Sequence, residues 1–142
     1  MNNHPHKTIL ALDVGERRIG VAAANMAARL AAPLTTLIKS ESTFSDIQAL
    51  IDQHDAELLV VGLPRGLDGQ HTSQTIVVEE FKSALEQYVS VSLHWQDEAL
   101  TSKQAESELE ARGKLYKKGD IDALSATYIL DDFMRDHPEV FL

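Results

Sequence analysis

The spacing of the hydrophobic residues changes once along this chain, near residue 40, and that change restricts the folds it can adopt. Before it, apolar runs of strand length occupy residues 8–13, 18–24 and 30–38. After it, segments with one apolar helical face alternate with short apolar runs. A strand meander followed by alternating helices and strands predicts an α/β fold, a mixed sheet with helices on both faces.

The connections predict the order of the five strands. Only residues 14–17 separate the first two runs, which suits an antiparallel hairpin. Pro33 favours an edge position for the third strand, since proline cannot donate a ladder hydrogen bond. The run at residues 58–62 (LLVVG) is almost wholly apolar, as expected of a covered parallel strand. Right-handed crossovers then place the first strand at the centre, in the order 3-2-1-4-5.

Four helices are predicted. The first contains Phe44, Ile47, Leu50 and Ile51 on one face, with Ser42 or Thr43 as its cap. The second spans residues 76–89, with apolar residues at 77, 81, 84, 85 and 88, and follows a polar loop at 64–75. A strand at residues 91–95 ends at Trp95. Two further helices cover about 101–112 and 120–135, and His137-Pro138 ends the last one.

Composition restricts the class of protein. A length of 142 residues predicts one domain, 1–142, with residues 1–6 as a flexible tail. The absence of cysteine excludes disulfides, thiolate metal sites and a cysteine nucleophile. No apolar run approaches the ~20 residues that span a bilayer, and the polar start lacks the apolar core of a signal peptide. We therefore expect a soluble cytoplasmic protein without a membrane partner.

The formal net charge of −9 opposes contact with a phosphate backbone, so any anion contact must use local positive residues. Arg17 and Arg18 are adjacent, and Arg65 follows a proline. A second basic group, with no acid inside it, lies before the last helix and comprises Arg112, Lys114, Lys117 and Lys118.

Three acidic positions fall where ligands gather in open α/β sheets, beyond the carboxyl ends of the parallel strands. Asp13 ends the first strand, Asp97 and Glu98 follow the last one, and Asp122 heads the apolar stripe of the final helix. Each also has a structural explanation: a turn cap before Gly15, a helix cap, or an acid near the positive end of a helix. Taken together, they could form an all-carboxylate shell for Mg²⁺ or Mn²⁺, as in two-metal phosphodiester hydrolysis.

Four segments together resemble one family. They read LDVGERRIG at 12–20, VVGLP at 60–64 with Asp68-Gly69, DEALT at 97–101 and KKGDIDALSA at 117–126. This pattern resembles the RuvX (YqgF) family, Holliday-junction-resolvase-like proteins that are also described as pre-16S rRNA nucleases. The resemblance covers nearly the whole chain. It implies an RNase H-like fold, a metal-dependent nuclease, and a part in maturing the 5′ end of small-subunit rRNA.

The resemblance also implies roles for individual residues. The family's catalytic, metal-binding acids fall on Asp13, on Glu98 with Asp97 beside it, and on Asp122. Its basic residues near the last helix fall on Lys117 and Lys118. Ala99 stands where the family usually has an arginine that could steady a phosphate. Gly62-Leu63 stands where broader RuvC-like resolvases place an acid.

These observations leave several functions open. The first is a nuclease with two Mg²⁺ or Mn²⁺ ions. Its substrate would be a ribosomal RNA precursor, either as free RNA or within the small ribosomal subunit. A DNA junction resolvase, which would act as a symmetric dimer, is the second, and a non-catalytic RNA-binding adaptor is the third. An ATPase fragment of the actin or hexokinase type would need a longer chain and a second phosphate loop. Both a monomer and a homodimer remain compatible with the sequence.

Overall fold

Five strands form one mixed sheet in the order β3-β2-β1-β4-β5. The computed structural model describes residues 7–64, 71–98 and 118–141. Its strands are β1 (Thr8–Val14), β2 (Arg18–Asn25), β3 (Ala31–Ile38), β4 (Ala56–Pro64) and β5 (Ser92–Glu98). Its helices are α1 (Thr43–Gln53), α2 (Ser73–Glu86), α4 (Lys118–Asp136) and the 3-10 turn η1 (Pro138–Phe141). The predicted fold class and strand order are both confirmed.

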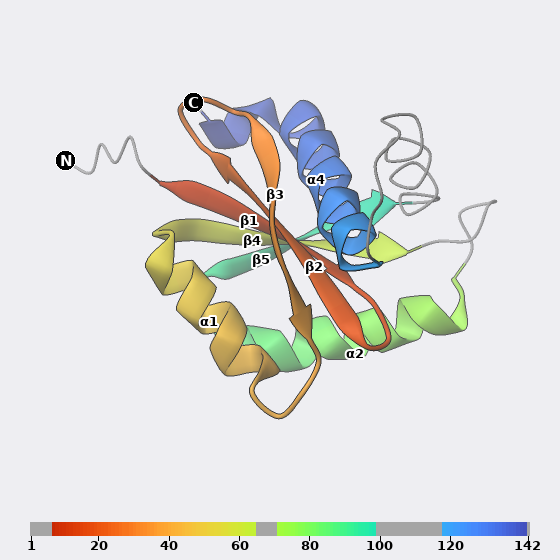
Figure 1. Ribbon diagram of the computed structural model, residues 1–142. Coiled ribbons are helices and arrows are strands. Elements are labelled where there is room, and N and C mark those ends of the chain that lie inside the picture. The colour runs from red at the N-terminus through yellow and green to blue at the C-terminus, as the bar shows by residue number, and fades with distance from the viewer. Residues whose placement is uncertain (1–6, 65–70, 99–117, 142) are drawn as a thin grey trace.

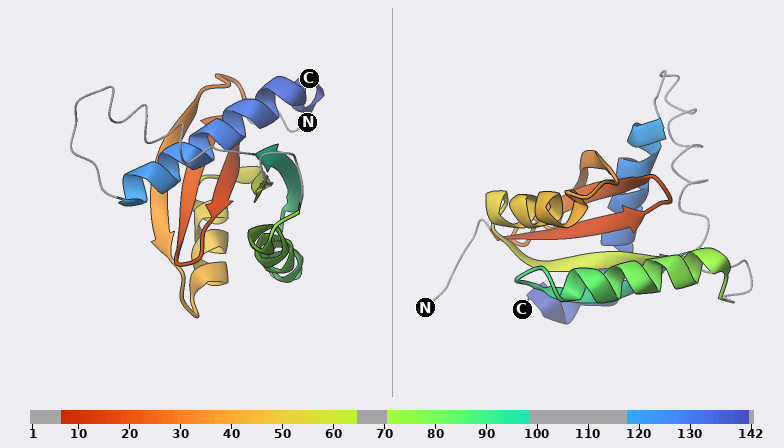
Figure 2. Two further views of the ribbon diagram at one scale, coloured as in Figure 1. Left: turned by 90° about the vertical axis from the view of Figure 1, so that its right-hand side faces the viewer. Right: turned by 90° about the horizontal axis from the view of Figure 1, so that it is seen from below.

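Helices cover both faces of the sheet, with α4 across one face and α1 and α2 on the other (Figure 1; Figure 2). Successive strand residues point to opposite faces, so each strand supplies two cores. In β1, Leu10 and Leu12 belong to the core on the α1 and α2 side. Ile9 and Ala11 belong to the core beneath α4, with Ile129 and Phe133.

Strand direction brings three carboxyl ends to one edge of the sheet. β1 pairs with β2 antiparallel and with β4 parallel, and β4 pairs with β5 parallel. The last residues of β1, β4 and β5 therefore lie at the same edge, where side chains from distant segments can meet. This edge carries the acidic residues predicted from the sequence.

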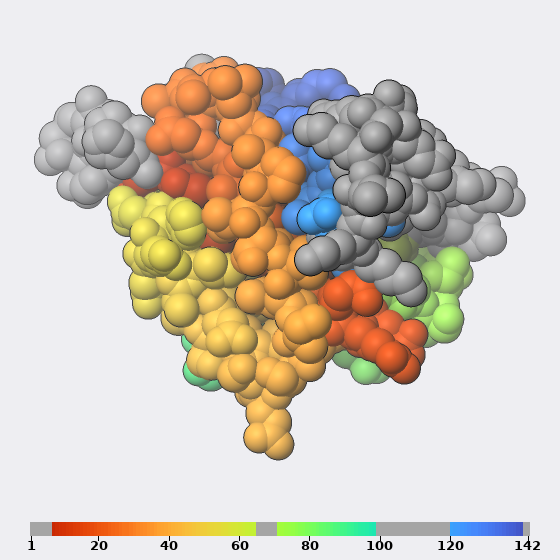
Figure 3. Space-filling model, in the orientation of Figure 1, coloured from red at the N-terminus to blue at the C-terminus, as the bar shows by residue number. Residues whose placement is uncertain are grey.

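Pro33 occupies an irregularity in the edge strand β3. It lies opposite Ala22, where the pairing of β2 with β3 shifts register. A bulge at an edge accommodates a residue without an N–H, which explains how the proline is tolerated. Figure 3 shows β3 running along the surface of the molecule, consistent with its edge position.

Two predicted boundaries are wrong in ways that matter for the site. β5 extends to Glu98 rather than ending at Trp95, so Asp97 and Glu98 lie within the strand. β1 likewise continues one residue past Asp13. Strand pairing with β4 extends β5, since Leu63 and Pro64 pair with Asp97 and Glu98.

Helix α2 begins and ends earlier than predicted and turns a different face inward. Thr72 and Thr75 form a capping box, and the Thr75 hydroxyl also donates to the Pro64 carbonyl at 2.6 Å. These contacts fix the start and the rotation of the helix. Val77 is consequently exposed, and the buried residues are Thr75, Val78, Lys82 and Leu85. Lys82 is accommodated because its ammonium lies over the Trp95 ring and pairs with Glu86.

The other predicted helices agree with the structure to different degrees. α4 begins two residues before and ends one residue after its predicted range of 120–135. α1 begins at Thr43, as its predicted cap implies, and Asp46 lies in its first turn. Ser42 precedes α1, but its side chain makes no capping hydrogen bond. The predicted helix at 101–112 and the predicted tail at 1–6 lie outside the described residues. Among the helices that the structure describes, none has the length and apolar character needed to cross a membrane.

Candidate functional site

Asp13 lies near the end of the central strand, on the face covered by α4. Ala11 and Ile9, two and four residues earlier, belong to the core beneath that helix. Asp13 pairs across the sheet with Gly20 of β2. Leu12 pairs with Val61, so the next residues along, Asp13 and Gly62, are neighbours. A carboxyl group therefore stands in the row Gly20, Asp13, Gly62, directly under the helix.

Gly20 allows α4 to approach Asp13 closely. A Cβ atom at this position would overlap the backbone carbonyl of Asp122 and crowd the Ala123 nitrogen. Ala123, Ser125 and Ala126 are buried, and their small side chains let α4 lie close to the sheet. This close packing places Asp122 beside the Asp13–Gly20 pair and leaves its side chain 20% exposed. Asp122 therefore lies on the partly buried, sheet-facing stripe of α4 rather than on its solvent-exposed side.

The surroundings of Asp13 change the pKa of its carboxyl group. Burial, and secondarily the charge of Asp122, raise the pKa of Asp13 from 3.8 to about 7. Among the described residues, no hydrogen bond reaches the Asp13 side chain to offset this effect. A carboxyl group in such surroundings is held as an anion only by a nearby positive charge.

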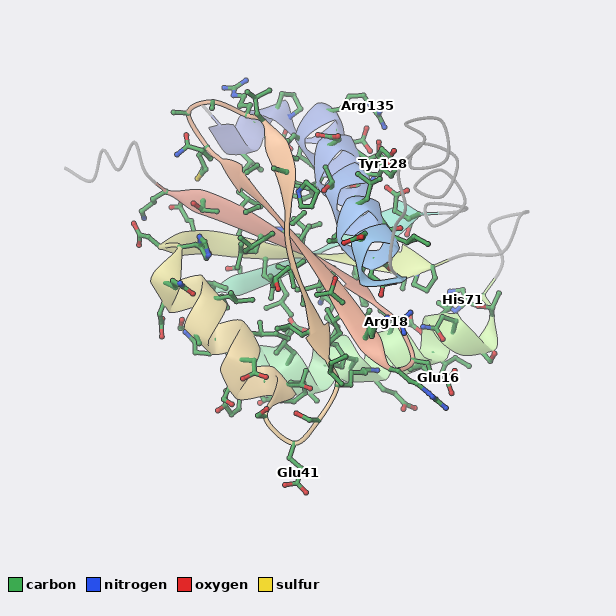
Figure 4. The ribbon with its side chains drawn as sticks, viewed as in Figure 1. Glu16, Arg18, Glu41, His71, Tyr128 and Arg135 are labelled. Carbon is green, nitrogen blue, oxygen red and sulfur yellow. The ribbon has the colours of Figure 1, made fainter. Side chains whose placement is uncertain are left out.

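Arg18 supplies one such charge, but to Asp122. Its Nε donates to Asp122 Oδ2 at 2.6 Å, and the two side chains are 32% and 20% exposed. Arg18 is the first residue of β2 and shares the α4 face with Gly20, two residues further on. Figure 4 shows Arg18 beside the first turns of α4, with Glu16 further out on the hairpin. Arg18 therefore orients Asp122, and the phosphate contact predicted for it stays a prediction.

We expect Arg18→Gln to destabilise the protein by about 1–2 kcal/mol at pH 7, more than a surface ion pair contributes, because Asp122 would remain partly buried without its partner. The measurement is urea unfolding. Arg135→Gln is the matched control, since Arg135 is 69% exposed in its pair with Asp132. Equal losses in the two variants would contradict a special role for the Arg18–Asp122 pair.

The strand geometry separates Glu98 from Asp97. His94 contacts Phe133 of α4, and Gln96 donates to Asp136 of α4 at 3.1 Å. By alternation Glu98 shares this face, whereas Asp97 shares the opposite face with Trp95. Ideal strand spacings put the Cα atoms of Glu98 and Asp13 about 12 Å apart, two strands and two residues removed. Glu98, partly buried, therefore lies at the same edge and on the same face as Asp13.

The residues that the structure describes do not by themselves form a complete metal-binding site. In the ranges that the structure describes, no group of three or more potential ligands is close enough to hold a metal ion. The structure brings Asp13 and Asp122 together and leaves Glu98 further along the edge. The fit to a divalent cation is nevertheless good, because burial and the neighbouring Asp122 charge raise the pKa of Asp13, and carboxylate oxygens are the donors that such a cation prefers.

The basic residues predicted to contact phosphate lie either in the β1–β2 hairpin or outside the residues that the structure describes. An open pocket of about 170 Å³ lies next to Asp122 and is lined also by Gly15, Glu16, Arg17 and Arg18. Arg17 is exposed there and can meet an anion. Arg65 and Lys117 fall outside the described residues, and Lys118 begins α4 with a side chain whose placement is not described.

Comparison with known families identifies the chain's relatives. The model of the family described as "RuvX: Holliday junction resolvase" matches residues 7–136. The chain belongs to the RuvX family. The resemblance inferred from the four sequence segments is thereby confirmed.

Curated members of the RuvX family match at similar length. A protein of Chloroflexus aggregans named "Putative pre-16S rRNA nuclease" is 41% identical over 132 residues, covering 90% of this chain and 93% of that one. A protein of Synechocystis with the same name is 36% identical over 135 residues, covering 90% and 89%.

A solved structure shows the fold of this RuvX chain. It is similar to Thermus thermophilus RuvC in complex with a Holliday junction substrate, with a TM-score of 0.55 and 13% identity. The match covers 91% of this chain and 96% of that one. The predicted RNase H-like fold is therefore confirmed.

Two features of the site are not evident from the sequence. Gly20 lies in a motif shared with the family, but its close contact with α4 is a property of the folded chain. Arg18 is predicted to contact an anion, whereas in the structure it pairs with Asp122. Strand alternation offered a signal for both, because it places Arg18 and Gly20 on the same face of β2.

Proposed function

We propose that this RuvX chain is a metal-dependent nuclease that cleaves phosphodiester bonds in a precursor of small-subunit rRNA. The observation that carries the proposal is the partly buried Asp13–Asp122 pair at the carboxyl edge of the sheet, with Glu98 on the same face. The names of the relatives support the choice of RNA, and maturation of the 5′ end is the corresponding cellular step. A cytoplasmic location follows from that substrate.

Each residue has a defined part in this proposal. Asp13, Asp122 and Glu98 hold Mg²⁺ or Mn²⁺, which when bound supplies Lewis-acid activation of the attacking water and stabilises the leaving oxygen. Arg18 fixes the orientation of Asp122 through Oδ2 and leaves the other carboxylate oxygen for the ion. Cations in the site would also hold Asp13 in its ionised form.

The hairpin pocket supplies a place for the substrate backbone. Arg17 is exposed beside the pocket, while Arg18 is held by Asp122, so Arg17 is the better placed of the two for a phosphate. Arg65, Lys117 and Lys118 are proposed as further phosphate contacts. The acidic net charge of −9 means that this local placement, rather than the overall field, must guide binding.

The adjacent acids of β5 give a sharp test of the site. We expect Glu98→Gln to lower cleavage of labelled precursor RNA by about 10²-fold or more, because it removes a proposed ion ligand. Asp97→Asn changes the neighbouring residue on the opposite face and should retain activity. Cleavage is measured with Mg²⁺ and with Mn²⁺. Equal activity of wild type and Glu98→Gln would contradict the proposal.

The same assay distinguishes RNA from junction DNA. The family description and the RuvC complex make a four-way junction the proper competing substrate. We expect the precursor RNA to be cleaved and the junction to be left intact. Preferential cleavage of the junction, with symmetric cuts by a dimer, would instead assign the protein as a resolvase. Binding of RNA without cleavage at any divalent ion concentration would support an adaptor.

A further inference from the structure

A buried hydroxyl on α4 has no partner and lies beside the acidic site. Ser125 is 0% exposed, and its Oγ forms no hydrogen bond in the structure as described. Other buried hydroxyls are bonded: Thr127 donates to the Ala123 carbonyl at 3.1 Å, and Thr75 donates to Pro64. Burying a hydroxyl without a hydrogen-bond partner is unfavourable. We therefore expect the Ser125 hydroxyl to gain a partner when a ligand occupies the neighbouring site.

The contacts of α4 fix where Ser125 lies along the sheet. Asp122 packs against Gly20, and Ile129 packs against Gly62. Asp13 stands between these two glycines in the same row of the sheet. Ser125 lies midway between Asp122 and Ile129, so its turn of α4 crosses the strand that carries Asp13.

The side of α4 on which Ser125 lies is also determined. Residues four or seven apart follow one flank of a helix, here Ser125, Ile129 and Asp136. Asp136 accepts from Gln96, near the carboxyl end of β5, so this flank faces the edge with the acids. The opposite flank, with Leu130 and Met134, belongs to the hydrophobic core beneath α4. Ser125 thus faces the acidic edge.

The Asp13 carboxyl and the Ser125 hydroxyl are chemically complementary as hydrogen-bond acceptor and donor. Among the described residues the Asp13 carboxyl accepts no hydrogen bond, and the Ser125 hydroxyl donates none. We infer that Ser125 is a positioning residue for Asp13: its hydroxyl holds the carboxylate, directly or across one water molecule, when a divalent cation occupies the site. The inference rests on the proposed function, because it assigns Ser125 a task in ion binding that the fold alone does not require.

Removing the Ser125 hydroxyl should therefore weaken ion binding without lowering the stability of the metal-free protein. Ser125→Ala should leave the thermal midpoint of the metal-free protein in EDTA unchanged or raise it, since no hydrogen bond is lost there. The same variant should weaken Mn²⁺ binding by about tenfold or more, the size of effect typical of groups that orient metal ligands. Mn²⁺ itself is the probe, titrated into the full chain and followed by electron paramagnetic resonance or calorimetry.

Thr127→Val is the matched control, because it removes a buried hydroxyl on the same helix that does have a partner. It should lower the thermal midpoint and leave Mn²⁺ affinity unchanged. Wild-type Mn²⁺ affinity in Ser125→Ala, or an equal loss in both variants, would overturn the role of Ser125 and leave the proposed function standing. A wild-type protein that does not bind Mn²⁺ would overturn the proposed function and this inference with it.

Discussion

Asp13→Asn should make the metal-free protein more stable at pH 8 and abolish the proposed nuclease activity. Asparagine keeps the shape of the side chain but carries no charge to bury beside Asp122. The pKa of Asp13, raised to about 7, implies a stabilisation on the order of 2–4 kcal/mol for the variant over wild type. Activity should fall by about 10²-fold or more, because a proposed ion ligand is lost.

The pH dependence has a definite sign. The folded protein binds the Asp13 proton more tightly than the unfolded chain, whose carboxyl has a pKa of 3.8. The resulting stabilisation is fully present below pH 3.8, falls as the pH rises toward about 7, and is absent above it. The stability difference between Asp13→Asn and wild type should therefore grow across that window and then level off.

Urea unfolding in EDTA at several pH values measures this difference, and repeating it with Mn²⁺ provides the control. Added Mn²⁺ should stabilise wild type at pH 8 and have little effect on Asp13→Asn, because only the folded wild-type protein binds the ion. A variant that is less stable than wild type at pH 8 without metal would contradict the burial of a charged Asp13.

Gly20→Ala should be among the most damaging single methyl additions in this fold. The new Cβ would overlap the backbone of α4 at Asp122, and a backbone cannot move aside by changing rotamer. We expect a loss of about 2–4 kcal/mol, at or above the usual range for overpacking. The displaced helix would also carry Asp122 away from Asp13, so Mn²⁺ affinity and nuclease activity should fall together.

Gly62→Ala is the control for Gly20→Ala, because it adds the same methyl under the same helix. Its Cβ would meet the end of the Ile129 side chain, which can change rotamer. We expect a loss of about 1 kcal/mol or less, partly offset by the lower backbone entropy of alanine. Urea unfolding of both variants measures the contrast. Equal losses would show that close approach of the α4 backbone is not the cause.

The strand order could be predicted because each connection left one reasonable solution. Four residues between the first two predicted strands favour a hairpin, and Pro33 disfavours a central position for the third strand. Crossover handedness then places the fourth and fifth strands on the far side of the first. The candidate acids were also identifiable, since each falls at or near the carboxyl end of a parallel strand or on the inner stripe of a helix. These are local patterns that sequence displays directly.

The geometry of the site depended on contacts between distant segments. The length of β5 is set by pairing with Leu63 and Pro64, and only that length puts Asp97 and Glu98 on opposite faces. The rotation of α2 is set by the bond from Thr75 to Pro64, which an apolar pattern does not reveal. The pairing of Arg18 with Asp122 joins residues 104 positions apart. No local rule predicts such contacts.

The most direct test of the site is a crystal soaked in Mn²⁺ and measured at the manganese absorption edge. We expect anomalous density among the carboxylates of Asp13, Asp122 and Glu98, with Arg18 still bonded to Asp122. Density elsewhere, or an empty site at millimolar Mn²⁺, would contradict the proposal that these three acids bind the catalytic ion.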